Sequence, residues 1–491
     1  MKPNQKSIFL ILGPLLFIFL QFFEPPKGMS ASAYSLLSIT LWMAIWWVTE
    51  SVPIAVTALL PIVLFPLTGA IDIATTTASY GHKYVFLYMG GFILAIAIEK
   101  WNLHKRIALH IIKIIGTDVS KIILGFMVAT ALLSMWISNT ATAVMMLPIG
   151  MSIVAQLQDN PNTEENENLI FGKALMLSIA YSASIGGMAT LIGTPPNLVF
   201  AGYVEEVYQI EITFFQWLKF GLPIALPLMV IAWIYLTKFA FTFKQKEFPG
   251  GKQEINRLLT ALGPMKREEK LVSIVFLLTA LSWITRSFIL EKFFPGIDDT
   301  IIAMISGVVL FMIPASGGKE RLIDWEDAVK LPWGIILLFG GGMALAAGFQ
   351  ITGLAAWLGS QMSMLQGLSL ILLVLVVITL VNFFTEFTSN LATTAMLLPI
   401  LAPIAISLNV NPYILMVSCT IAASCAFMMP VATPPNAVVF GSGYLRIPDM
   451  IKSGIWMNIL SILFLTIMVY YMLPLVWGFD VGDFTEFVRG K

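Results

Sequence analysis

Charged residues are scarce in this chain of 491 residues: they make up 11% of it, whereas hydrophobic residues make up 58%. Soluble globular proteins carry about 25% charged residues, so the composition excludes an ordinary soluble domain. Stretches such as 7–23, 271–290 and 455–475 reach the roughly 20 apolar residues that cross a bilayer core. No small-residue cleavage site follows Phe23, so we interpret the first stretch as a retained membrane helix. We therefore expect an all-α polytopic membrane protein.

Cysteine and histidine are also rare, and the few present do not form a recognisable site. Cys419 and Cys425 lie in one apolar segment, where small thiols pack as hydrophobic residues. The three histidines have no cysteine or carboxylate at metal-ligand spacing. The sequence has no His-Glu-x-x-His motif and no nucleophile–base pair, so we do not expect an enzyme. The net charge is zero and the basic runs flank hydrophobic spans, so we expect no nucleic-acid partner.

Two polar motifs each occur twice within this apolar sequence. Ser-Asn-Thr at 138–140 corresponds to Ser-Asn-Leu at 389–391. Gly-Thr-Pro-Pro-Asn at 193–197 corresponds to Ala-Thr-Pro-Pro-Asn at 432–436. A lipid-embedded protein tolerates such helix-breaking segments where they line a cavity. Two copies at matching places of two halves indicate the binding site of a transporter.

The spacing of the motifs shows an internal repeat. The Ser-Asn motifs are 251 residues apart (389 − 138), and the Thr-Pro-Pro-Asn motifs are 239 apart (433 − 194). A polar insertion at 158–168, which we interpret as a loop, accounts for the difference of 12 residues. The two halves therefore share an architecture and differ by one loop.

The apolar pattern predicts eleven membrane spans, two of them interrupted, and two re-entrant hairpins. The hairpins are expected at 121–157 and 367–408. The spans are expected at 7–23, 33–49, 53–68, 84–98, 172–203, 217–240, 271–290, 300–314, 333–349, 412–442 and 452–476.

The distribution of basic residues predicts the orientation. With a cytoplasmic N-terminus, 21 of the 28 Lys and Arg residues fall in cytoplasmic segments, as the positive-inside rule requires. The first hairpin then enters from the inside and the second from the outside, which makes the halves inverted repeats. We divide the chain into N-terminal scaffold helices (1–80), a first repeat (81–240), a cytoplasmic linker (241–270) and a second repeat (271–491). A multi-pass protein of the cell inner or plasma membrane is expected.

The repeated motifs predict four helix N-termini directed at one place. Ser, Asn and Thr are strong N-cap residues, and each Pro-Pro pair breaks one helix while allowing another to begin. A helix N-terminus presents free N–H groups and about half a positive charge. Four such ends can bind a small dianion without an arginine.

The same segments offer oxygen ligands for a cation. Ser134 and Ser138 are four residues apart, as are Thr385 and Ser389, so each pair points two hydroxyls the same way on a helix. Amide oxygens of the asparagines and carbonyls freed at the helix breaks complete an all-oxygen pocket. Neutral oxygen ligands suit Na⁺ and suit zinc or copper poorly.

With these motifs, and with Trp-Val-Thr-Glu-Ser-Val-Pro at 47–53, the chain resembles the divalent anion–sodium symporter family over essentially its whole length. The resemblance implies a homodimer in the lipid bilayer, with scaffold and transport domains and an elevator motion. It implies one Na⁺ bound by Ser134, Ser138, Asn139 and Gly193, and another bound by Thr385, Thr388, Ser389, Asn390 and Ala432. It implies substrate carboxylates bound by Asn139, Thr140, Thr194, Asn390, Thr433 and Pro434.

One position departs from the dicarboxylate pattern of that family. Leu391 stands where the pattern has threonine, so a hydroxyl contact worth about 1 kcal/mol is lost. The citrate-preferring branches of the family also carry apolar residues there. A sodium-coupled symporter of a C4-dicarboxylate such as succinate, malate or fumarate remains our first expectation. The alternatives are a citrate or sulfate symporter and a Na⁺-independent dicarboxylate exchanger; a channel is less consistent with the paired motifs.

Overall fold

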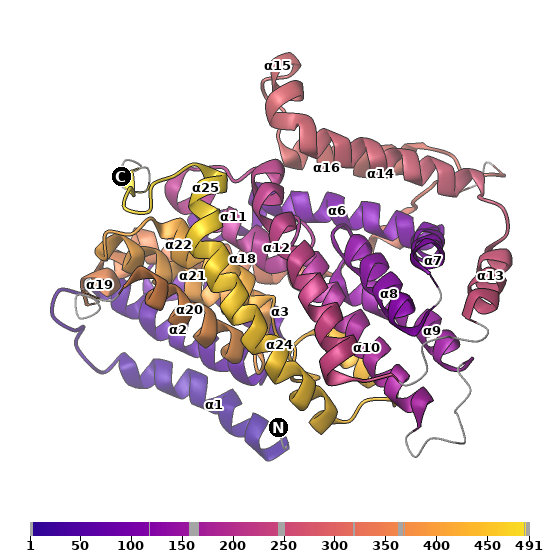
Figure 1. Cartoon of the computed structure of the whole chain (residues 1–491). Coiled ribbons are helices and arrows are strands. Elements are labelled where there is room, and N and C mark those ends of the chain that lie inside the picture. Colours follow the sequence, from indigo (N-terminus) through magenta and orange to yellow (C-terminus); the bar gives the residue numbers. More distant parts are fainter. Residues whose placement is uncertain are drawn as a thin grey trace.

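The computed structural model describes residues 3–116, 118–156, 166–243, 251–317, 320–361, 367, 369–485 and 487. Within these ranges every regular element is a helix, and one isolated β-bridge joins Pro314 to Arg321. The all-α class expected from the composition is confirmed. Figure 1 shows the helices packed side by side in one body, with α14, α15 and α16 along one edge.

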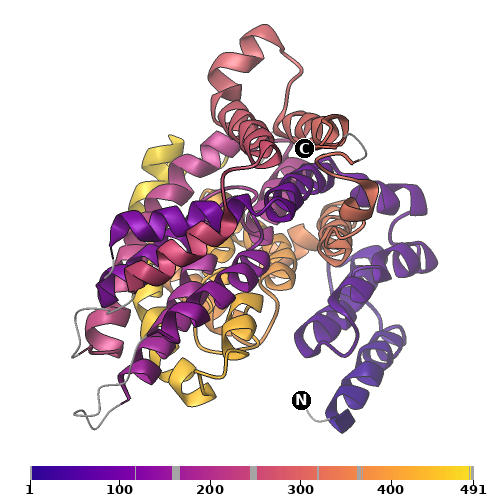
Figure 2. The same cartoon turned by 90° about the vertical axis from the view of Figure 1, so that its right-hand side faces the viewer.

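The N-terminal part contains two long helices followed by short ones. They lie at one edge of the molecule, in indigo in Figure 2. Their bounds are α1 (Pro3–Leu20), α2 (Ala31–Thr49), α3 (Ile54–Thr57), α4 (Leu60–Thr68), α5 (Ile73–Ala78) and the 3-10 turn η1 (Ser79–Gly81).

The structure divides the predicted span at 53–68 into two helices, α3 and α4. Pro61 is the second residue of α4 and has no amide hydrogen to donate to the Thr57 carbonyl. The helix that starts at Ile54 therefore ends after one turn, and a second helix begins at Leu60.

The first half contains a hairpin and a broken helix, as expected. The hairpin arms are α8 and α9, and the break lies between α10 and α11. Of the expected loop at 158–168, residues 158–165 lie outside the described part of the chain. The bounds are α6 (Lys83–Lys100), α7 (Leu103–Ile115), α8 (Val119–Ser134), α9 (Asn139–Val154), α10 (Glu167–Gly187), α11 (Pro195–Tyr208), α12 (Phe214–Ile234) and the π-helical turn η2 (Tyr235–Ala240).

The second half repeats this order: the arms α20 and α21 form a hairpin, and a break separates α22 from α23. The bounds are α13 (Gly251–Leu262), α14 (Arg267–Thr285), η3 (Arg286–Leu290), α15 (Glu291–Phe293), α16 (Asp299–Met312), α17 (Trp325–Ala328), α18 (Trp333–Ile351), α19 (Leu354–Gln361), α20 (Leu370–Thr385), α21 (Asn390–Ser407), α22 (Pro412–Ala423), α23 (Pro434–Phe440), α24 (Ile447–Ile467), η5 (Met468–Met472) and α25 (Leu473–Trp477).

Helices α7 and α13 lie in segments that we assigned to cytoplasmic connections. Polar contacts attach both to membrane helices. Arg106 of α7 pairs with Glu269 of α14 at 2.6 Å, and Ser152 of α9 donates to Glu254 of α13 at 2.5 Å. The linker therefore contains a helix fixed against the first hairpin.

Eight described helices are long and apolar enough to cross a membrane, and seven shorter apolar helices accompany them. Four expected spans, at 7–23, 53–68, 300–314 and 412–442, fall among the shorter ones, so the eleven-span topology stays a prediction. Large apolar side chains are exposed on the outer helices, such as Ile11 of α1, Leu278 of α14 and Leu463 of α24. Such a surface suits lipid rather than water.

The hairpins and the broken helices pack on one another across the two halves. Helix α10 contacts both arms of the first hairpin, and α22 contacts both arms of the second. Helix α23 crosses over to α9 and α10, and α11 crosses to α21. These exchanged contacts bring the four polar motifs to a common centre.

Candidate functional site

The four polar motifs line one cavity of about 1050 Å³. Its opposite wall comes from residues 50–55 before and within α3, from α6 and from α18. The predicted residues that line it are Ser138, Asn139, Thr140, Gly193, Thr194, Ser389, Asn390, Ala432, Thr433 and Pro434. The predicted ligands Ser134, Thr385 and Thr388 are buried behind this surface.

Four helices begin at this cavity, and the local sequence explains each start. Ser138 is the N-cap of α9, and its hydroxyl accepts the amide hydrogen of Ala141 at 3.2 Å. Thr433 does the same for Asn436 at the start of α23. Ser389 precedes α21, and Thr194 precedes α11 with proline at its first position. The N-terminal dipoles of all four helices therefore meet at one cavity.

Among the described residues that line the cavity there is no lysine or arginine, and Glu50 is the one charged residue. The described residues also contain no group of three or more His, Cys, Asp or Glu side chains that could hold a metal. An anion in the cavity would therefore meet helix N-termini, hydroxyls and amides rather than basic side chains.

The first oxygen cluster, formed by Ser134, Asn139, Ala183 and Gly193, lies at the tip of the first hairpin. The Ser134 hydroxyl is 2.5 Å from the Asn139 side-chain oxygen and 2.6 Å from the Ala183 carbonyl. The Asn139 oxygen also lies 3.1 Å from the Ala183 carbonyl and 3.2 Å from the Gly193 carbonyl. It faces acceptors only. Rotation of the amide would turn these contacts into hydrogen bonds, whereas a shared monovalent cation would use the oxygens as ligands.

The second oxygen cluster, formed by Thr385, Asn390 and Ala423, repeats this geometry. The Thr385 hydroxyl donates to the Asn390 side-chain oxygen at 2.7 Å and approaches the Ala423 carbonyl at 3.3 Å. The predicted ligand Thr388 is engaged elsewhere, because its hydroxyl is 2.6 Å from that of Thr393. The donor set is neutral oxygen in both clusters, which fits Na⁺.

These hydroxyls differ from several other buried hydroxyls of the protein. Ser178, Ser418 and Thr420 bond to carbonyls three or four residues earlier in their own helices. That is the usual structural role of such residues in membrane helices. Ser134 and Thr385 instead reach across to the other arm of a hairpin and to a broken helix, which brings oxygens of distant segments together.

Glycine permits the close packing of the first cluster. A Cβ at Gly187 would lie 2.3 Å from the Asn139 side-chain oxygen, and one at Gly193 would lie 2.4 Å from the Gly187 carbonyl. Real Cβ atoms essentially never approach other atoms so closely. Sequence reasoning found Gly193 and missed Gly187, whose contact to Asn139 is made through the fold.

Sequence reasoning also left the last residue of each proline motif without a role. The Asn197 amide donates to the Thr190 carbonyl at 2.7 Å, within the break between α10 and α11. The Asn436 amide donates to the carbonyls of Met429 and Ala426 at 3.0 and 3.2 Å in the other break. Each asparagine therefore stabilises the helix break that precedes it. Its occurrence in both copies of the motif was the sequence signal that could have indicated this role.

Leu391 lines the cavity but is largely buried, with 5% of its surface exposed, whereas Thr140 at the equivalent place is exposed. The two halves thus present different side chains to a ligand: a hydroxyl in the first and a packed apolar group in the second.

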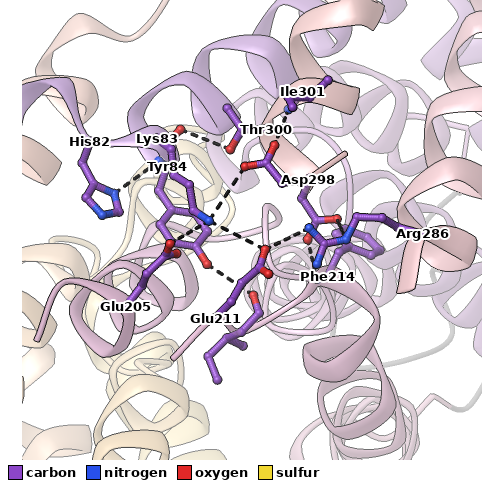
Figure 3. A network of polar contacts seen from close by, with 12 residues as sticks. His82, Lys83, Tyr84, Glu205, Glu211, Phe214, Arg286, Asp298, Thr300 and Ile301 are labelled. Carbon is purple, nitrogen blue, oxygen red and sulfur yellow. Dashed lines mark hydrogen bonds and ion pairs between the residues drawn. The ribbon is translucent and has the colours of Figure 1, made fainter. Parts of the chain in front are cut away.

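Buried basic groups lie in a separate ion-pair network (Figure 3). Arg286, whose side chain is 2% exposed, pairs with Glu211 at 2.9 Å and with Asp299 at 3.3 Å. Lys83 pairs with Glu205 at 2.7 Å. This network joins α6 to α11, and η3 to α16 and to the connection before α12. Its cations are occupied by carboxylates and do not line the cavity.

Comparison with known proteins gives full-length relatives. The chain is 46% identical over 492 residues to the sodium-dependent dicarboxylate transporter SdcS of Staphylococcus saprophyticus, covering 98% of this chain and 95% of that one. It is 47% identical over 490 residues to SdcS of Staphylococcus aureus strain USA300, covering 98% and 94%.

Two solved structures share the fold at low sequence identity. The YdaH transporter of Alcanivorax borkumensis has a TM-score of 0.59 at 14% identity, covering 96% of this chain and 98% of that one. MtrF of Neisseria gonorrhoeae has a TM-score of 0.59 at 13% identity, covering 98% and 96%.

The family comparison confirms the resemblance seen in the motifs, and because its members are transporters it also confirms that the chain is not an enzyme. Residues 5–478 match the model of the sodium:sulfate symporter transmembrane region. The chain therefore belongs to the sodium:sulfate symporter family of membrane transporters.

Proposed function

We propose that this protein is a sodium-coupled symporter that imports a C4-dicarboxylate such as succinate, malate or fumarate. The observation that carries the proposal is the meeting of four helix N-termini and two oxygen clusters at one cavity without a basic side chain. The relatives named as sodium-dependent dicarboxylate transporters support both the cation and the substrate class.

The helix N-termini would bind the two carboxylates of the substrate. In our proposal, Asn139, Thr140 and Thr194 meet one carboxylate, and Asn390 and Thr433 meet the other. Pro434, the first residue of α23, borders the same surface. Free N–H groups and the positive ends of the helix dipoles then stabilise the two negative charges.

Sodium ions would complete the charge balance. One ion in each oxygen cluster offsets the two negative charges of the substrate in a site of low dielectric constant. The first ion would be held by Ser134, Ser138, Asn139 and Gly193. The second would be held by Thr385, Ser389, Asn390 and Ala432, and by Thr388 once its hydroxyl turns away from Thr393. Because Asn139 and Asn390 would contact both the cation and the substrate, cation binding shapes the anion site.

We infer that transport follows an elevator motion in a homodimer with a cytoplasmic N-terminus. The hairpins and broken helices pack on one another and hold the site, whereas α3, α6 and α18 form the facing wall. A sliding of the first group along the second would carry the site across the membrane. The ion pair between Lys83 of α6 and Glu205 of α11 joins the two groups and would have to separate during that motion (Figure 3).

Two other functions keep specific support. Buried Leu391 removes one hydroxyl from the anion site, which favours a citrate symporter, and the family description names sulfate. A Na⁺-independent dicarboxylate exchanger would not need Ser134 and Thr385, which are present and directed into the clusters.

Uptake by proteoliposomes tests the proposal. Purified protein is reconstituted, and uptake of radiolabelled succinate, citrate and sulfate is followed with an inward Na⁺ gradient and with choline in place of Na⁺. We expect saturable succinate uptake that needs Na⁺ and exceeds that of citrate and sulfate. Equal uptake in choline would establish the exchanger, and a preference for citrate or sulfate would replace the dicarboxylate.

A further inference from the structure

Glu386 is a fully buried carboxylate at the tip of the second hairpin, directly after α20. Its two oxygens accept five hydrogen bonds of 2.7–3.1 Å. The donors are the backbone N–H groups of Phe427, Met428 and Met429 and the side-chain amide of Asn458. All four partners are donors, and the Met428 N–H is shared by both oxygens, whereas a protonated carboxyl would need an acceptor for its own hydrogen. The surroundings of Glu386 therefore fit the ionised form.

The backbone held by Glu386 leads directly to the second cation site. Phe427, Met428 and Met429 lie in the break between α22 and α23. The Met429 carbonyl accepts the Ala432 amide hydrogen at 3.2 Å and the Asn436 side-chain amide at 3.0 Å. Glu386 thus fixes the segment that positions the Ala432 carbonyl. It also directly follows Thr385, a member of the second oxygen cluster.

At the equivalent position the first half carries a neutral residue. The equivalent position is Met135 (386 − 251). There the hairpin tip and the helix break are joined by neutral groups: the Thr190 hydroxyl donates to the Met135 carbonyl at 2.5 Å, and Asn197 holds Thr190 in turn. The two oxygen clusters are alike in geometry, but among the described residues only the second has a buried carboxylate, that of Glu386, on the residue next to one of its members in the sequence.

We propose that Glu386 is a positioning residue that pre-assembles the second cation site and raises its affinity for Na⁺. The second site then fills at a lower Na⁺ concentration than the first. Two physical effects act in the same direction. A carboxylate close to a cation in a low dielectric attracts it, and a connection that is already held in place loses less freedom when the ion binds. This inference rests on the proposed sodium coupling.

Two matched cysteine reporters can follow the sites separately in the full-length purified protein. Ile192 and Val431 occupy equivalent positions (431 − 192 = 239), line the cavity, and each immediately precedes a predicted carbonyl ligand, Gly193 or Ala432. Ile192 is 8% exposed and Val431 73%, so the reporters are compared by their Na⁺ midpoints and not by their absolute labelling rates. The native Cys419 and Cys425 are fully buried, so background labelling should be slow. The rate of maleimide labelling of Ile192→Cys and Val431→Cys is measured while Na⁺ replaces choline at constant ionic strength.

We expect Na⁺ to slow the labelling of both reporters, with a lower midpoint at 431 than at 192. Glu386→Gln should raise the midpoint at 431 about tenfold, equivalent to 1.4 kcal/mol, and leave the midpoint at 192 within twofold. Glu386→Asp keeps the charge and should give a smaller shift. A purely structural role would move both midpoints together or remove the Na⁺ response.

Equal midpoints in the parent protein, or a Glu386→Gln variant that shifts both reporters or neither, would overturn the inference. If Glu386→Gln does not fold, Asn458→Ala removes one donor and keeps the charge, and its shift must then be confined to the 431 reporter. A parent protein in which Na⁺ protects neither reporter, and in which uptake needs no Na⁺, would instead refute the proposed function itself.

Discussion

Gly187→Ala is the sharpest perturbation of the first cation site, because it adds one methyl group and removes no polar atom. The new Cβ would lie 2.3 Å from the Asn139 side-chain oxygen and 2.8 Å from its nitrogen. Ordinary contact begins at 3.4 Å, so the amide must move by about 1 Å (3.4 − 2.3). The added methyl therefore displaces the group that we assign to both cation and substrate.

The size of the effect follows from the contacts that the movement breaks. The Asn139 oxygen lies 2.5 Å from the Ser134 hydroxyl and 3.2 Å from the Gly193 carbonyl. The displaced oxygen is one of the proposed Na⁺ ligands, and a lost polar interaction with a charged group costs about 2 kcal/mol, so the first site should bind Na⁺ about 30-fold more weakly. The Na⁺ concentration that gives half-maximal succinate uptake in proteoliposomes should rise by a similar factor.

A matched glycine elsewhere controls for the methyl group itself. Gly307 of α16 is also a helical glycine, but a Cβ there would meet the Ile93 side chain at 3.5 Å, an ordinary contact. Gly307→Ala should keep the parental Na⁺ dependence, and thermal melting of both variants checks that they fold. A folded Gly187→Ala variant with the parental Na⁺ dependence would refute the assignment of Asn139 to a cation site.

Three further predictions concern other groups. Asn139→Ala or Asn390→Ala should abolish Na⁺-dependent uptake while membrane expression is retained; normal transport by either variant would contradict the site. Leu391→Thr should restore a hydroxyl and change the ranking of succinate against citrate in competition assays, and an unchanged ranking would mean that this side chain does not affect the ligand. Burial raises the pKa of Glu211, but its hydrogen bond to Arg286 and the nearby positive charges outweigh burial and leave the pKa below 4.5. Because the folded pKa is depressed, this contribution to stability is present above pH 4.5 and lost below it, so the melting temperature of the parent should fall more steeply there than that of Glu211→Gln.

The hairpins and helix breaks could be predicted from sequence because their causes are local. Ser138 and Ser389 cap helices through their own side chains, and a Pro-Pro pair ends a helix wherever it occurs. The spacing of 251 residues between Ser138 and Ser389 then showed from sequence alone that the two halves correspond.

The remaining features depend on contacts between distant segments. The Ala183 and Ala423 carbonyls in the oxygen clusters, and the contact between Gly187 and Asn139, arise only when a helix break packs on a hairpin tip. The division of 53–68 into two helices was missed for another reason. We predicted one span there because the segment is apolar throughout. Pro61, near the start of α4, was the local signal for a break in the helix.

Equilibrium binding of radiolabelled succinate to the purified protein, measured across a range of Na⁺ concentrations, tests most directly whether cations build the anion site. The account predicts tight binding in Na⁺, little binding in choline, and none in Asn139→Ala or Asn390→Ala at any Na⁺ concentration tested. Succinate binding of equal strength in choline and in Na⁺ would contradict it.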